Sequence, residues 1–326
     1  MDASDKEIEV KLEKNKSKSK PSPTIGLPSV MKIQKKVARF TILTPTIFTV
    51  VALLLAWQYG ITALDMILLV SMYIVANLGI EFCFHRDLAH GSYKTKSWVT
   101  YLFTIFGSMA GQGGVIYWVA THRRHHIHSD TEHDPHSPHV RNIGEGEEKM
   151  NTAQGIMHSH IGWMFNDKMT NCSLFAIDLS RDPTMVAINK YYFLILATGI
   201  VLPGLVAFAI TGEVYAFLTG MLWGGFVRLF LGHHSTWANS SFSHLYGGQP
   251  FDTGDLSANN FWCSIPTFGA SWQNNHHAFP TSAYLGLEWW QIDIAGYFIR
   301  AMNKMGLVWD VKFPSEKRKQ DKLVKV

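Results

Sequence analysis

Cysteine is scarce in this chain of 326 residues. There are three, Cys83, Cys172 and Cys263, and they lie far apart and form no CxxC pair. This spacing argues against both a disulfide framework and a zinc ribbon. Three thiols also cannot hold an iron–sulfur cluster that takes four cysteine ligands. We therefore expect the functional side of the protein to face a reducing compartment.

The chain also lacks a strong excess of charge of one sign, and we expect its first residues not to be a secretory signal sequence. Its net charge is +4 at neutral pH, and we expect no nucleic-acid partner. Residues 1–30 are rich in lysine, glutamate, serine and proline and contain no apolar segment. We expect them to form a disordered, lysine-rich arm. Residues 311–326 are expected to form a basic tail.

Long apolar runs are the dominant feature of the remaining sequence. The mean hydropathy of +0.03 hides them, because it averages apolar runs with a polar, histidine-rich part. Four runs are predicted to cross a membrane, over residues of about 40–57, 63–84, 191–210 and 214–232. Short connections at 60–62 and 211–213 join them in pairs. We predict an all-α integral membrane protein with four transmembrane helices in two hairpins.

The distribution of lysine and arginine predicts the orientation. Neither short connection contains these residues, whereas both ends of the chain and its middle region do. By the positive-inside rule, both termini and the histidine-rich portion are predicted to be cytoplasmic. We expect a helical cytoplasmic cap over residues 85–190 and 233–310, which completes a membrane domain over residues 31–310.

A further apolar run, from Trp98 to Ala120, is long enough to cross the membrane. If it did, the first two histidine clusters would lie on opposite faces and could not share a site. The run contains four glycines and a glutamine between Gly107 and Gly114, a composition poorly suited to a helix facing lipid. We predict that it does not span.

Histidines are concentrated in three segments: HRDLAH at 85–90, HRRHH at 122–126 and QNNHH at 273–277. On an α-helix, His122, His125 and His126 share one face, because positions i, i+3 and i+4 are neighbours. Gln273 opens the same pattern in the third segment. His85 and His90 are five residues apart, about 140° around an α-helix, so they converge only at a helix end or on two different metals.

This supply of imidazoles exceeds the needs of one metal ion. Neutral imidazole suits zinc, iron, copper and nickel. Ligands for two ions, on helices that rise out of a membrane, indicate a dinuclear site that acts on an apolar substrate. The other histidines lie in polar sequence and are expected to support the ligands or to lie at the surface: His128, His133, His136, His139, His158 and His160.

The three histidine segments, with AFPTSA after the third and SHLYG at 243–247, resemble the membrane fatty acyl desaturases. The similarity is greatest to the stearoyl-CoA desaturase-like Δ9 group and runs from about residue 60 to 310. It implies two Fe²⁺ ions and no catalytic residue beyond the metal centre. The implied ligands are His85, His90, His122, His125, His126, His244, His276 and His277.

The sequence departs from the pattern of that family in three respects. Gln273 stands where the third segment usually begins with histidine, and Ser240 replaces an asparagine, with Asn239 one position away. Gln273, Ser240 and Asn239 are possible metal ligands, directly or through water. Ala120 and Thr121 replace an Arg-Asp pair that contacts coenzyme A in animal members. The acyl carrier therefore stays open between acyl-CoA, acyl-lipid and acyl-carrier protein.

The resemblance also implies a tunnel for the acyl chain under the metals. Gln112, Trp118, Thr236 and Trp237 match family positions near the bend of the chain. For the two tryptophans, packing at the membrane interface is the alternative interpretation.

The implied reaction is O2-dependent desaturation, in which two hydrogens leave adjacent methylenes and a cis double bond forms, by expectation at Δ9. The sequence has no haem-binding HPGG motif and too few cysteines for an iron–sulfur cluster, so the electrons must come from another protein such as cytochrome b5 or ferredoxin. The basic segments could dock this donor or anchor the chain to the membrane surface. The alternatives are a hydroxylase of the same di-iron class and a histidine-rich metal transporter.

Overall fold

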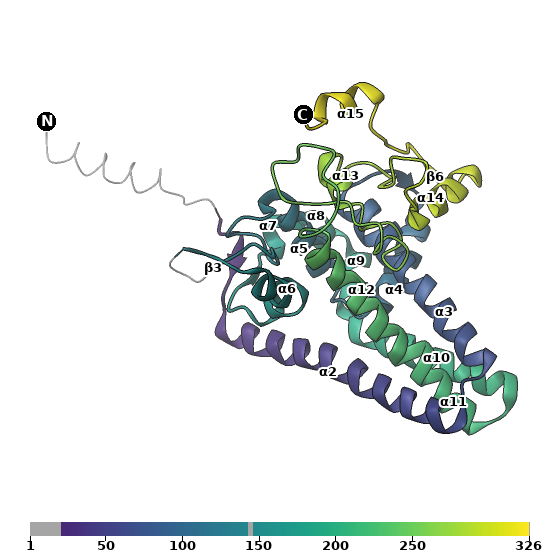
Figure 1. Cartoon of the computed structure of the whole chain (residues 1–326). Helices are drawn as coiled ribbons and strands as arrows, with labels where there is room; N and C mark the ends of the chain where they lie inside the picture. Colours follow the sequence, from purple (N-terminus) through teal and green to yellow (C-terminus); the bar gives the residue numbers. More distant parts are fainter. Residues whose placement is uncertain (1–20, 143–145, 326) are drawn as a thin grey trace, which may run out of the picture.

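The computed structural model describes residues 21–142 and 146–325, and this part of the chain is mostly helical. Four helices in it are long and apolar enough to cross a membrane. They are α2 (Pro28–Tyr59), α3 (Ala63–Leu78) continued by η1 (Gly79–Ala89), α10 (Tyr192–Thr211), and α11 (Val214–Gly220) continued by η3 (Met221–Val227) and α12 (Arg228–Phe242). In Figure 1 these helices extend towards the lower right, and the remaining elements gather around their other end.

The remaining elements are short. The helices are α4 (Ser97–Met109), α5 (Val115–His128), α6 (Thr152–His160), η2 (Gly162–Phe165), α7 (Cys172–Phe175), α8 (Ile177–Arg181), α9 (Pro183–Lys190), α13 (Gln273–Ala278), α14 (Ile294–Lys304) and α15 (Glu316–Lys322). The strands form three antiparallel pairs: β1 (Thr24–Ile25) with β5 (Met169–Thr170), β2 (Lys94–Thr95) with β6 (Val308–Trp309), and β3 (Val140–Asn142) with β4 (Glu147–Lys149).

The ends of the described chain are more regular than the sequence suggests. Of the expected disordered arm, residues 1–20 lie outside the described residues, whereas residues 21–30 form β1 and begin α2. Pro28 stands at the start of that helix, where its fixed φ suits the first turn and its missing N–H is not needed. The expected basic tail contains α15, which the Ser315 side chain caps.

The second long helix changes type before it reaches the histidines. Its last part, η1, is a π-helix, in which the backbone bonds step five residues instead of four. The N–H of His90, the residue that ends η1, accordingly donates to the carbonyl of His85 at 3.2 Å. His85 and His90, which an α-helix would direct to different faces, are thereby brought onto one face.

The run from Trp98 to Ala120, predicted not to span, is not one helix. It is divided into α4 and α5 by a turn at 110–114, and it is not among the four helices long and apolar enough to span. Gly111 has φ +75°, and a Cβ there would lie 2.8 Å from the Leu229 side chain and 2.9 Å from Nε2 of His233. Only glycine fits this close approach.

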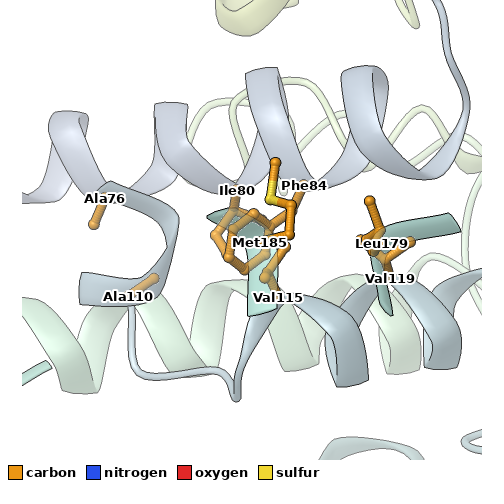
Figure 2. Close-up of a cluster of buried hydrophobic side chains, with 8 residues drawn as sticks. All are labelled: Ala76, Ile80, Phe84, Ala110, Val115, Val119, Leu179 and Met185. Atoms are coloured by element: carbon orange, nitrogen blue, oxygen red, sulfur yellow. The ribbon is translucent and has the colours of Figure 1, made fainter. Parts of the chain in front are cut away.

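A buried apolar cluster fixes the second helix against α5 (Figure 2). Ile80 and Phe84 point from η1 towards Val115 and Val119 of α5, and all four are 0–1% exposed. Full burial of each such side chain is worth about 1.5–3 kcal/mol. Because the histidines follow directly on both helices, this packing sets their relative position.

Candidate metal centre

Five histidines from three segments form a first group. They are His85, His90, His122, His126 and His276, and one ring nitrogen of each lies within 4.8 Å of the others. Nε2 of His85 is 2.9 Å from Nε2 of His276, and Nε2 of His90 is 2.7 Å from Nε2 of His122. The π-helical geometry of η1 brings His85 and His90 into one group.

A second group lies beside the first. It consists of His125 from α5, His244 just after α12, and His277 from α13, with one ring nitrogen of each within the same 4.8 Å limit. The rings of His126 and His277 are 4.4 Å apart and link the two groups. Helix geometry accounts for the division within this face, because His122 and His126 are about one turn apart, whereas His125 is turned by about 100° from His126.

Carboxylates hold several of these rings in place through hydrogen bonds with Nδ1. Nδ1 of His85 donates to Glu81 at 2.8 Å, and Nδ1 of His125 donates to Asp134 at 3.0 Å. These bonds leave each Nε2 without its proton and facing inward, the tautomer that a metal needs.

Two more pairs repeat the arrangement in the second group. Nδ1 of His244 donates to Asp130 at 3.0 Å, and Nδ1 of His277 donates to Asp255 at 2.5 Å. All three histidines of the second group therefore have a carboxylate partner.

Several inward-facing atoms lack a hydrogen-bond partner among the described residues. They are Nε2 of His126, His244 and His277, and Oε1 of Gln273, all buried. An unsatisfied buried polar atom is costly in a folded protein. Lone pairs gathered in one buried space are what metal ions require, so the residues present fit a metal centre.

Burial favours the neutral form of four histidines in the first group. Desolvation, and then the neighbouring imidazoles, hold the pKa values of His90, His122, His126 and His276 well below the ordinary range of histidine. Neutral imidazole is the form that binds metals.

Charge pairing acts at His244. Burial alone lowers the pKa of His244, but the Asp130 carboxylate outweighs it and raises the pKa. The same contact lowers the pKa of Asp130.

The metal centre forms one wall of a cavity of about 170 Å³. All four residues predicted for the acyl tunnel line it, together with Gln273, Asn239 and Ser240. Nε2 of Gln112 donates to Oγ1 of Thr236 at 2.6 Å, and Nε1 of Trp118 donates to Oε1 of Gln112 at 3.3 Å. These bonds join α5, the glycine-rich turn and α12 at the side of the cavity.

Two histidines expected at the periphery support the ligands. The ring of His136 lies 4.5 Å from that of His125, and Nε2 of His139 bonds the carbonyl of His244 at 2.8 Å. The sequence reasoning missed the carboxylates. Asp130 and Asp134 lie in the histidine-rich segment, so the usual partnership of metal-binding histidine with carboxylate was a signal for them. Asp255 comes from a distant loop, and no sequence signal pointed to it.

The fold and the site define a helical protein with membrane-length helices and a histidine cluster able to bind metal. The sequence profile of the family described as fatty acid desaturase matches residues 57–311. The chain belongs to the fatty acid desaturase family.

Known proteins that the chain is similar to act on different acyl substrates. A hex-5-enoyl-(acyl-carrier protein) acetylenase of Moorena producens (strain JHB) is 42% identical over 91% of this chain and 92% of its own length. An sn-1 stearoyl-lipid 9-desaturase of Anabaena variabilis is 35% identical over 77% of this chain and 84% of its own. A chloroplastic palmitoyl-monogalactosyldiacylglycerol delta-7 desaturase of Arabidopsis thaliana is 38% identical over 77% of this chain and 62% of its own.

Proposed function

We propose that this protein is an O2-dependent fatty acyl desaturase with a histidine-ligated di-iron centre and an external electron donor. One observation carries the proposal: two adjacent groups of buried or partly buried imidazoles contribute to the wall of a largely apolar cavity. Neutral imidazoles bind iron well, and the two groups divide naturally between two ions. Membership of the desaturase family supports the same reaction.

The five histidines of the first group would hold one Fe²⁺ ion. His125, His244 and His277 would hold the other, with Gln273 supplying its unpartnered Oε1. Asn239 and Ser240 line the same cavity and would hold a water at the second ion.

The two ions would supply reductive activation of O2. The protein's own residues would orient the ligand rings and enclose the acyl chain. Glu81, Asp130, Asp134 and Asp255 hold four ligand rings in one tautomer, so the site needs little rearrangement when metal binds. The apolar cavity excludes water, and Gln112 with Thr236 fixes the wall beside the ligands, so that one C–H pair of the acyl chain is presented.

The position of the new double bond is the finer part of the proposal. Δ9 is the expectation from the sequence, and the relatives include a 9-desaturase, a 7-desaturase, an acetylenase and an icosanoyl-CoA 5-desaturase of Limnanthes douglasii. Their names also include acyl-lipid, acyl-CoA and acyl-carrier-protein substrates. All three carriers are therefore candidates for this chain.

We place the protein in the membrane as two hairpins with both termini and the metal centre on the cytoplasmic side. The absence of lysine and arginine from the connections at 60–62 and 211–213 supports this orientation. A separate donor protein such as cytochrome b5 or ferredoxin would then reach the cap. The basic segment α15 lies close to the ligands, since Nζ of Lys322 donates to the carbonyl of Ala278, next to His277.

Expression in a host that makes no unsaturated fatty acids tests the proposal. The wild-type chain should create a new monoenoic acid in the fatty-acid profile by gas chromatography with mass spectrometry. His126→Ala should abolish it, whereas His128→Ala, on the same helix but outside both metal groups, should not. No new double bond from an iron-loaded wild-type protein would refute the proposal.

A further inference from the structure

The cavity beside the histidines, here called the acyl cavity, adjoins a second, polar pocket of about 440 Å³. Gln34, Tyr117 and Trp163 line both, so they mark the junction. Arg124 and Lys168 are among the polar residues of the second pocket. Charged side chains are costly to place against hydrocarbon, so this pocket belongs to the aqueous side of the junction.

Gln34 presents an unused hydrogen-bond acceptor at the junction. It lies on α2 on the same face as Val37, Ala38 and Thr41, which also line the acyl cavity. Its Nε2 donates to the carbonyl of Met164 at 3.4 Å. Its Oε1 is buried, and no donor reaches it from the part of the chain that the structure describes. Turning the amide over would set Oε1 against the Met164 carbonyl, two acceptors in contact, so this orientation is the favourable one.

The polarity of this atom discriminates between acyl carriers. A glycerolipid offers only ester oxygens next to its acyl chain, and these accept hydrogen bonds. A pantetheine thioester carries an amide N–H two carbons beyond its sulfur, and this group donates. Leaving Oε1 unpaired in the complex would cost the affinity of a buried hydrogen bond.

Building on the proposed desaturase function, we propose that the substrate is an acyl thioester. Its pantetheine arm enters through the polar pocket and donates its first amide N–H to Oε1 of Gln34. The arm is common to coenzyme A and acyl carrier protein, so both are sources of the same chemistry, and a membrane acyl-lipid is not.

Binding of a minimal thioester tests this without turnover. The iron-loaded protein in lipid nanodiscs, with no electron donor, is titrated calorimetrically with S-octanoyl-N-acetylcysteamine and with its N-methyl amide, which lacks the N–H. The wild type should bind the parent compound about fivefold more tightly, the worth of one hydrogen bond. Gln34→Leu should bind both equally, and Gln34→Glu, which keeps an acceptor, should restore the preference. Gln58→Leu, at the exposed far end of α2, should behave as the wild type.

Competition identifies the source of the arm. Displacement of the probe by octanoyl-CoA, by octanoyl-acyl carrier protein, or by both supports the proposal and says which carrier is used. Equal affinity of the wild type for the two probes, or displacement by a dioctanoyl glycerolipid alone, would overturn it. Desaturation of acyl-lipids without any N–H dependence would sink this inference and leave the proposed desaturase intact. Probe binding that needs Gln34, with no unsaturated product, would support this inference and refute the proposed desaturase function.

Discussion

Gln273 is the residue at which the metal centre of this chain departs most from a full set of imidazoles. It lies three and four residues before His276 and His277 on α13, so all three share one face of the helix. It is 5% exposed, and its Oε1 has no hydrogen-bond partner among the described residues. In the proposed di-iron centre, this buried amide oxygen would be a weak, neutral ligand of the second ion.

Replacing Gln273 should change one metal ion and not the other. Gln273→Leu removes the oxygen, so the affinity of the second group for Fe²⁺ should fall by roughly tenfold, while the first group keeps its ion. Gln273→His should raise the second affinity. Iron per protein, measured by plasma mass spectrometry during titration with a chelator, reports both steps. Equal loss of both irons from the leucine variant, or no loss at all, would contradict this role.

At the scale of elements, the close contact between η1 and α4 sets the position of the helix that carries His85. Gly79 begins η1 and lies against Gly107 of α4, and a Cβ at position 79 would come 2.0 Å from the backbone nitrogen of Gly107. No side chain can give way there, because the obstacle is backbone. The crossing therefore holds η1, and with it His85, at a fixed distance from α4.

Gly79→Ala should destabilise the protein by about 3 kcal/mol or more, the upper range for an overpacked contact, because the two helices must separate. Gly232→Ala is the matched control on α12, where a Cβ meets nothing within 4 Å; it should be neutral or stabilising by up to about 1 kcal/mol. Thermal unfolding in detergent compares the two. Equal unfolding temperatures would show that the crossing is not tight.

The contact of α6 with α12 predicts a dependence on pH. His160 bonds His234 at 3.0 Å and Ser241 at 3.2 Å, and burial, followed by the charge of His234, lowers the pKa of His160 to about 4. An unfolded histidine has a pKa of about 6.5, so between these values the unfolded state binds the extra proton. Stability from this group is therefore present above pH 6.5 and is lost as the pH falls towards 4.

His160→Gln removes this titration while keeping a polar side chain. Its unfolding temperature should fall less than that of the wild type between about pH 7 and pH 5. Thermal unfolding at both pH values measures the difference. Parallel decreases in the two proteins would show that His160 does not titrate as argued.

At the scale of the whole molecule, the sequence predicted the four long helices, because their length and apolar composition are sufficient to recognise them. It predicted that the fifth apolar run does not span, but not that this run is divided into two helices. It also predicted that His122, His125 and His126 lie together, since helical periodicity is readable from spacing. The convergence of His85 and His90 was only one of two alternatives, because a π-helical segment has no simple sequence signature.

Long-range partners were the least predictable features. Asp255 reaches His277 from a loop 22 residues away in the chain, and Gln34 reaches the acyl cavity from the start of α2. Such contacts depend on tertiary packing, whereas sequence patterns report on neighbours along one element. The ligand assignment itself stays a prediction that metal analysis of the variants will test.

The most direct test of the central claim is the mass of the acyl product formed by the purified, iron-loaded protein with O2 and a reduced electron donor. A desaturase removes two hydrogens, so the product should be lighter than the substrate by two hydrogens, with the oxygen of O2 recovered in water. A product heavier by one oxygen atom would instead identify a hydroxylase and contradict the account.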